Sequence, residues 1–141
     1  MKTGMMLRKQ DGGSAVEFAI ILPLFLLIVF GIVEWSMYLF NDHIITNASR
    51  SGARHGIIQV TPRVPSSEIQ QAVLDYSEKN LVTFGTKNQP QIIVPAICTT
   101  FGENLSVKVS YTYTFLFLPA LTAGILPQSK TIVAETVMKC E

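Results

Sequence analysis

The sequence predicts an α+β protein in which a long N-terminal helix, apolar enough to cross a membrane, packs against a small antiparallel β-sheet domain. The run from Phe18 to Val33 carries no charge. Apolar residues then recur at three- and four-residue intervals as far as Gly52, which is the spacing of a helix. From Leu105 to Phe115 they alternate with polar residues instead, the period of a half-buried strand. A chain of 141 residues suits one small domain plus this helix.

The apolar segment continues to Phe40 and carries one charge on the way, Glu34. About 20 mostly apolar residues span a bilayer core of about 30 Å, so the segment is long enough to cross. Glu17 lies at its lip, where a deeply buried and unpaired carboxylate costs about 2–3 kcal/mol. We therefore expect Glu17 to have a positive partner. A cut after Gly12 would make Glu17 the fifth residue behind a new, charged amino terminus.

The residues around this point resemble a known processing site. A basic leader, a glycine, four residues, Glu-Phe and an uninterrupted apolar helix form the pattern of type IV prepilins, in the form used by Flp (tight adherence, Tad) pili. The resemblance to the TadE-like pseudopilin family extends over residues 12–54. It rests on Val16-Glu17-Phe18-Ala19, Leu22-Pro23-Leu24, Phe30-Gly31-Ile32-Val33-Glu34 and Asn47-Ala48-Ser49-Arg50-Ser51-Gly52-Ala53-Arg54.

This resemblance implies a pilin-like fold and a non-enzymatic role, as a minor pseudopilin needed to assemble a Tad/Flp (type IVb) pilus. It implies that a prepilin peptidase cuts between Gly12 and Gly13, and that Glu17 pairs with the Gly13 amino group of a neighbouring subunit. A cut after Gly13 would leave Glu17 one residue short of the family spacing. The implied partners are the inner membrane, the peptidase, other pseudopilins or the major Flp pilin, and the Tad secretion platform. A place in the fibre and a role only in starting it both remain open.

Charges in the leader predict the orientation. Residues 1–12 carry Lys2, Arg8 and Lys9 against Asp11, a flank that the positive-inside rule keeps in the cytoplasm. We therefore expect residues 1–12 to be a cytoplasmic prepilin leader. Residues 13–56 would form the long helix, transmembrane to about residue 40, and residues 57–141 a periplasmic α+β domain. A secretory signal peptide is the rival, but its apolar region should be about 7–15 residues and end in small residues.

Beyond the bilayer, one apolar stripe is expected to continue the helix. Its members are Met37, Phe40, Ile44, Ala48 and Gly52, and the other faces carry Asp42, His43, Asn47, Arg50 and Arg54. Trp35 and Tyr38 are placed for an interfacial aromatic belt. From about Ser14 to His55 the helix would be roughly 60 Å long.

Some residues of this helix have two interpretations. Arg50 and Arg54 suit a solvated face near a helix C-terminus, where cations are favoured, or a contact with a neighbouring pseudopilin or acidic lipid. The small residues Ala48 and Gly52 would let another helix approach closely. Pro23 indicates a kink, or a point of local melting on assembly.

Turn and period signals outline the rest. Residues 61–65 contain two prolines and predict a linker, and Ser67 with Gln70 predicts a capping box at the start of a second helix. Ile69, Ala72, Val73 and Tyr76 would be its buried face. Strands are expected over 91–98, at an edge because of Pro95, over 105–115, and over 131–140.

Two features concern the end of the chain. Residues 115–126 are apolar and lie in a charge-free stretch from Val109 to Ser129, which favours a long loop with an exposed or membrane-facing patch over a second span. The only two cysteines, Cys98 and Cys140, fall at the ends of two expected strands in the exported part. We expect them to form a disulfide, because the periplasm permits one.

Several function classes find no support. The net charge is +1, without a basic face, which disfavours nucleic-acid binding. The histidines His43 and His55 have no third ligand nearby, so we expect no metal or other cofactor. No catalytic triad, phosphate-binding glycine loop or HExxH motif is present. Two rivals remain: a signal-anchored periplasmic binding module with its leader uncleaved, and a secreted, soluble domain.

Overall fold

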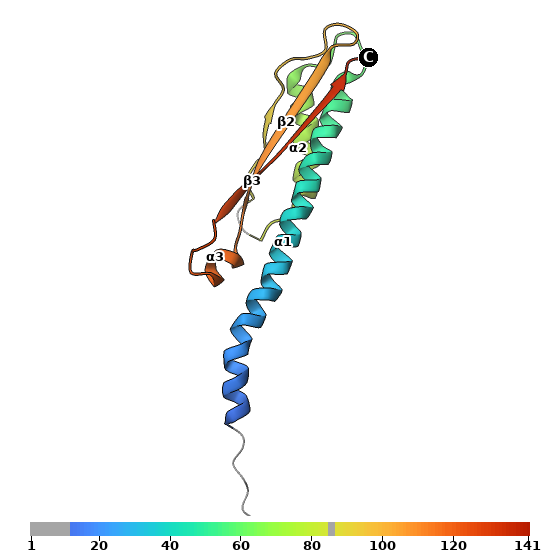
Figure 1. Ribbon diagram of the computed structural model, residues 1–141. Helices are drawn as coiled ribbons and strands as arrows, with labels where there is room; N and C mark the ends of the chain where they lie inside the picture. The colour runs from blue at the N-terminus through green and yellow to red at the C-terminus, as the bar shows by residue number, and fades with distance from the viewer. Residues whose placement is uncertain (1–11, 85–86) are drawn as a thin grey trace, which may run out of the picture.

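The structure is a computed structural model that describes residues 12–84 and 87–141, and it confirms the predicted α+β, pilin-like class. The order of elements is α1 (Gly13–Ile57), α2 (Ser66–Asn80), β1 (Gln91–Ile93), β2 (Asn104–Thr114), α3 (Phe117–Leu121) and β3 (Ser129–Lys139). Figure 1 shows α1 as a stem whose N-terminal part, before the level of α3, projects beyond the other elements. Apart from Gly12, the expected leader lies outside the described residues.

The stem is one continuous helix of 45 residues that passes through Pro23 without a break. Its buried side chains begin at Glu34 and recur toward the C-terminal end. The predicted stripe is correct at Ile44, Ala48 and Gly52 and wrong at Phe40, which is 48% exposed. Tyr38 is buried in its place, because its ring packs against Tyr113 and Phe115 of the sheet. Tyr38 is therefore a core residue, whereas Trp35 stays 46% exposed.

Helix α2 runs antiparallel to α1, since Ile69 near its start meets the glycines late in α1 and Val82 just beyond its end bonds to Asn41. Ile69 and Val73 are fully buried, as predicted. The third fully buried residue is Ser77, whose hydroxyl donates to the Val73 carbonyl. The predicted capping box is wrong: Pro65 is the N-cap, no side chain caps the helix, and the Pro65 carbonyl accepts from the Glu68 and Ile69 amides instead.

The sheet has three antiparallel strands in the order β1-β2-β3. Strands β2 and β3 pair along their whole length, from Asn104 opposite Lys139 to Thr114 opposite Ser129. In β2 every second residue is buried, which confirms the predicted alternation. Strand β1 is at an edge but pairs over only three residues, so the expected strand over 91–98 is too long. Pro95 comes two residues after this short pairing, and proline cannot donate to a strand ladder.

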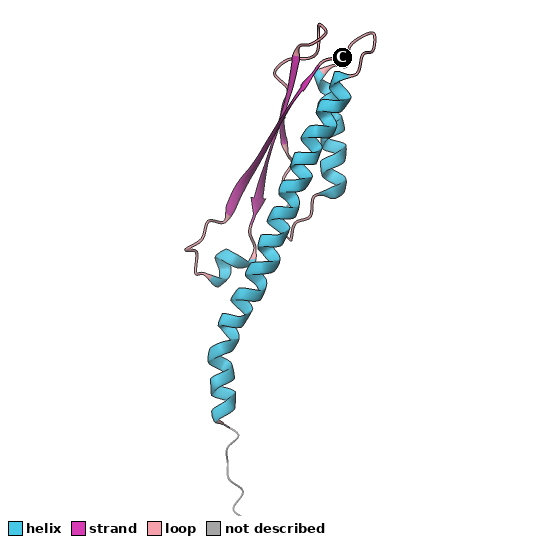
Figure 2. Ribbon diagram, turned by 45° about the vertical axis from the view of Figure 1, so that its right-hand side comes forward, coloured by secondary structure: helices cyan, strands magenta, loops and turns pink. Residues whose placement is uncertain are grey.

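Both long helices lie on one side of the sheet, as Figure 2 shows. The core forms between these layers, and its aliphatic centre includes Ile45, Ile69 and Leu105. Two polar links border it, one from α1 to the chain after α2 and one from α1 to β3. The Asn41 side chain donates to the Val82 carbonyl at 2.6 Å and accepts from the Val82 amide at 3.0 Å, and the Ser49 and Thr136 hydroxyls lie 2.7 Å apart. Among the described residues, no buried side-chain polar atom lacks a hydrogen-bond partner.

The chain between β2 and β3 is more ordered than the expected loop. It contains α3, a single helical turn that packs against α1. Phe117 stacks on Phe30 with ring centroids 4.9 Å apart. The expected exposed patch is present beyond α3, where Ile125 is 85% exposed. Sequence periodicity missed α3 because five residues are too few to show a helical repeat.

At the opposite end of the domain Cys98 and Cys140 form a disulfide, with Cα atoms 5.7 Å apart. The last residue lies near the end of α1, because the Glu141 amide donates to the Ile57 carbonyl at 3.3 Å. Arg63 adds a bond to the Glu141 carbonyl at 2.9 Å. The disulfide and these bonds hold the chain terminus against the top of the stem.

Candidate functional site

The predicted processing residues lie at the free N-terminal end of α1. Gly12 is the N-cap residue, and its carbonyl accepts from the Val16 amide at 3.3 Å. A β-carbon placed at Gly12 or Gly13 would meet no described atom within 4 Å. Glu17 is exposed and makes no hydrogen bond or ion pair with any residue that the structure describes. The side chain that needs a positive partner therefore finds none within this part of the chain.

The first half of α1 presents apolar side chains on all sides. It is long and apolar enough to cross a membrane, and none of the apolar window is buried inside the protein. Exposed members include Val16, Phe18, Ile20, Leu24, Phe25 and Ile28. Ala19 and Pro23, two of the signature residues on which the TadE-like resemblance rests, are exposed as well. A core helix of a soluble protein would cover such a surface, so this half of α1 is suited to lipid or to neighbouring helices.

The later signature residues divide into two groups. Ala48, Gly52 and Ala53 are buried. A β-carbon at Gly52 would overlap Val73 Cγ2 and lie 3.5 Å from the Ile69 carbonyl oxygen. At Gly52 the close approach of another helix that we expected is thus made by α2 of the same chain. The other group, Asn47, Arg50 and Arg54, is exposed, which leaves both interpretations of the arginines open.

Glu34 is the residue whose surroundings sequence reasoning missed. Its side chain is fully buried, whereas its apolar neighbours Val33 and Trp35 are exposed. Its carboxylate accepts from the Leu116 amide, from the Phe117 amide at 3.1 and 3.2 Å, and from the Leu118 amide at 2.7 Å. These are the first amides of α3, where the helix dipole also favours an anion. Burial, together with the negative charge of Glu34, raises the pKa of Tyr113.

A signal for this contact was present in the sequence. Glu34 is a carboxylate in an apolar helix, and the reasoning that predicts a partner for Glu17 applies to it equally. Backbone amides rather than a cation compensate the charge of Glu34. Sequence patterns do not show which backbone amides lack a partner within their own helix or strand. The signature residue Gly31 lies beside the same contact, with Leu118 Cδ2 3.5 Å from the position of a β-carbon.

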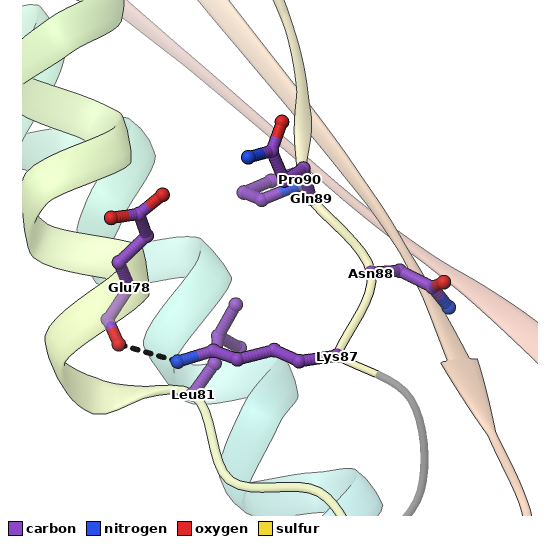
Figure 3. A pocket seen from close by; sticks show the side chains of 6 residues that line it. All are labelled: Glu78, Leu81, Lys87, Asn88, Gln89 and Pro90. Atoms are coloured by element: carbon purple, nitrogen blue, oxygen red, sulfur yellow. Dashed lines mark hydrogen bonds between the residues drawn. The ribbon is translucent and has the colours of Figure 1, made fainter.

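The cavities do not suggest catalysis. Figure 3 shows one of about 340 Å³ beyond the end of α2, across which Lys87 Nζ donates to the Glu78 carbonyl at 2.5 Å. Its other lining residues, Leu81, Asn88, Gln89 and Pro90, form no acid–base pair. Within residues 12–84 and 87–141, no three His, Cys, Asp or Glu residues are grouped as metal ligands would be. His55 lies 3.0 Å from Glu68 in an exposed pair.

One carboxylate has a strongly shifted pKa. The Thr99 hydroxyl and the Thr99 and Thr100 amides donate to Glu103 and lower its pKa to about 2. All of these groups belong to one exposed turn between Cys98 and β2. The shift therefore reflects a stabilised turn and not a reactive site.

Fold and site together define a class: a pilin-like protein with a single apolar N-terminal helix, fitted to a membrane, and a small α+β domain on its distal half. The model of the family described as TadE-like protein matches residues 12–54, the same residues that carry the resemblance. Over these residues α1 is similar to the TadE-like family, and the match does not extend to the domain that follows. Comparisons with curated proteins and with solved structures found no match.

Proposed function

We propose that this protein is a minor pseudopilin required to assemble a Tad/Flp pilus. A prepilin peptidase cuts its leader between Gly12 and Gly13, and the mature helix stays in the bacterial inner membrane. The leader faces the cytoplasm and the domain faces the periplasm. The subunit then packs with other pseudopilins or the major Flp pilin at the Tad secretion platform.

One observation supports the proposal above the others: the TadE-like match includes the apolar N-terminal part of α1, of which the rest of the described chain covers little. The match begins at Gly12, at the proposed cut, and most of the apolar side chains that follow are exposed up to Val33. A helix that only anchored a domain would need apolar residues, but it would not need a carboxylate near its start. Glu17 is therefore the residue that separates assembly from simple anchoring.

In the proposed mechanism Glu17 pairs with the Gly13 amino group of a neighbouring subunit. Cleavage creates this cation four residues before Glu17, at the end of the helix where a β-carbon at either glycine would meet none of the described atoms within 4 Å. Pairing offsets the cost of burying both charges, and removing one partner leaves the other unpaired in an apolar setting. The pair would set the register between subunits.

The test is to replace Glu17 in a host that depends on this subunit for piliation. Glu17→Ala should insert, be processed and reach normal levels in the membrane, yet fail to support pili counted by electron microscopy. Ile20→Ala, a truncation of a side chain 72% exposed on the same helix, is the matched control and should keep piliation. Normal piliation with Glu17→Ala would remove this role for the carboxylate.

A further inference from the structure

We propose that residues 115–127, which we name the membrane foot, form a second membrane contact in the leaflet next to the domain. The foot comprises Phe115, Leu116, α3 and the turn that leads toward β3. The proposal requires that α1 crosses a bilayer, but not that the protein is cleaved or joins a pilus.

The attachment point of the foot sets its depth. The charge-free run from Phe18 to Val33 covers only about 24 Å as a helix, less than a bilayer core of about 30 Å. The crossing must therefore continue past Val33, and the C-terminal end of that run lies in the hydrocarbon region or at its boundary. Phe117 stacks on Phe30, and Leu118 lies beside Gly31, both within the run. The foot is thus held against a part of α1 that the membrane must cover.

The hydrogen bonds that the foot donates to Glu34 explain how the helix tolerates this carboxylate at such a depth in the membrane. Its two oxygens are occupied by three amides of the foot, and its side chain is fully buried. An ionised group facing lipid there would be costly, and the foot removes it from lipid. After Glu34, α1 carries no charge until Asp42, so the shielded segment is long enough for a complete crossing.

The outer surface of the foot has the composition of a lipid-facing segment. Ile125 is 85% exposed, Leu116 47% and Leu126 41%. The stretch from Val109 to Ser129 contains no charged residue, so no charge in it has to be desolvated on insertion. A water-facing turn of this length would ordinarily carry polar or charged groups.

Trp35 and Lys130 mark the side of the foot that we expect to face the lipid headgroups. The Lys130 amino group lies 5.4 Å from the Trp35 ring centroid and 5.0 Å from that of Tyr38. Tryptophan and a lysine that extends toward the headgroups are typical of the membrane interface. With Phe115, Leu118, Leu126 and Pro127 they line a cleft of about 430 Å³, which an acyl chain would fill below a phosphate bound by Lys130.

Tryptophan fluorescence of the full chain in vesicles tests the proposal. Trp35 is the only tryptophan, so a Trp35→Phe background is free of this signal. Into it we would place Ile125→Trp and, separately, Phe101→Trp. The two sites are matched, since each native side chain is 85% exposed. Phe101 lies at the far end of the domain, where the Gly102 amide donates to the Cys140 carbonyl.

In vesicles of phosphatidylcholine and phosphatidylglycerol, Ile125→Trp should emit at shorter wavelength than Phe101→Trp. Chains brominated near the headgroup should quench Ile125→Trp and not Phe101→Trp. Aqueous iodide should quench only Phe101→Trp. The unaltered protein, with Trp35, provides the positive control for insertion of α1.

Two results would overturn the proposal. Ile125→Trp could be quenched by iodide as strongly as Phe101→Trp, which would place the foot in water. It could instead emit at short wavelength without quenching by brominated chains, and change with the ratio of protein to lipid. That result would assign the foot to a contact between copies of the chain. Retained circular dichroism checks that each variant is folded.

Discussion

Two carboxylates on α1 have opposite surroundings. Glu34 is fully buried and bound by the amides of α3, whereas Glu17 is exposed and makes no bond to a described residue. Since a charge in an apolar helix needs compensation, the chain itself supplies it for Glu34. For Glu17 the compensation is proposed to come from a neighbouring subunit. One carboxylate thus serves the fold, and the other is proposed to serve assembly.

At this scale we predict that Glu34→Ala releases α3 from α1. Hydrogen bonds to a charged group contribute about 1.5–3 kcal/mol each, so losing the carboxylate should lower the free energy of unfolding by about 3 kcal/mol or more. Hydrogen exchange in detergent or vesicles should speed up at the amides of Leu116, Phe117 and Leu118. Glu68→Ala, which removes an exposed pair with His55, is the control and should leave these amides unchanged. Unaltered exchange in Glu34→Ala would contradict the role.

Single residues were predictable where a regular period governed them. The buried set Leu105, Val107 and Val109 follows from alternation alone. We predicted that Phe40 is buried and that Tyr38 faces the membrane interface, and the structure shows the reverse. The helix presents one apolar face to lipid and another to the domain, and the sequence does not show where the first gives way to the second. Glu34 could be predicted to need a partner, but its partners are backbone amides, and these leave no mark in the sequence.

Among the elements, α1 and α2 depend on small residues for their packing. Gly52 lies where any side chain would overlap Val73, a branched residue that is fully buried and has no room to move. The signature glycine therefore permits a contact within the chain. Gly31 differs, since a β-carbon there would only touch Leu118 Cδ2 at 3.5 Å.

We predict that Gly52→Ala destabilises the protein whereas Gly31→Ala does not. Overpacking a filled core costs about 1–3 kcal/mol, and both substitutions gain similar helix propensity. Thermal unfolding of the two variants should therefore differ by about that amount. In a Val73→Ala background the overlapping atoms are gone, and the extra cost of Gly52→Ala should disappear. An equal effect of Gly52→Ala with and without Val73 would contradict the packing argument.

Elements were predictable in proportion to their length. The stem and the paired strands β2 and β3 carry long periodic patterns, and each was found where its pattern lies. Strand β1 was overestimated because an apolar run does not show where pairing stops. Helix α3 was missed because its stability comes from Glu34 and Phe30, both far from it in sequence.

The molecule as a whole has two ends with different chemistry. Its disulfide and the bonds of Glu141 close the domain at the far end of α1. At the near end the stem emerges apolar and largely uncovered beyond the foot. A protein built this way holds its domain close to a membrane surface and leaves the first half of its helix free for lipid or other helices.

The most direct test of the account is the intact mass and amino-terminal sequence of the protein from the native membrane fraction. The account predicts a start at Gly13 in a host with an active prepilin peptidase. Gly12→Arg, which changes the residue before the cut, should start at Met1 and migrate more slowly on a gel. A native protein that also starts at Met1 would contradict the account, and would leave a signal-anchored periplasmic module as its better description.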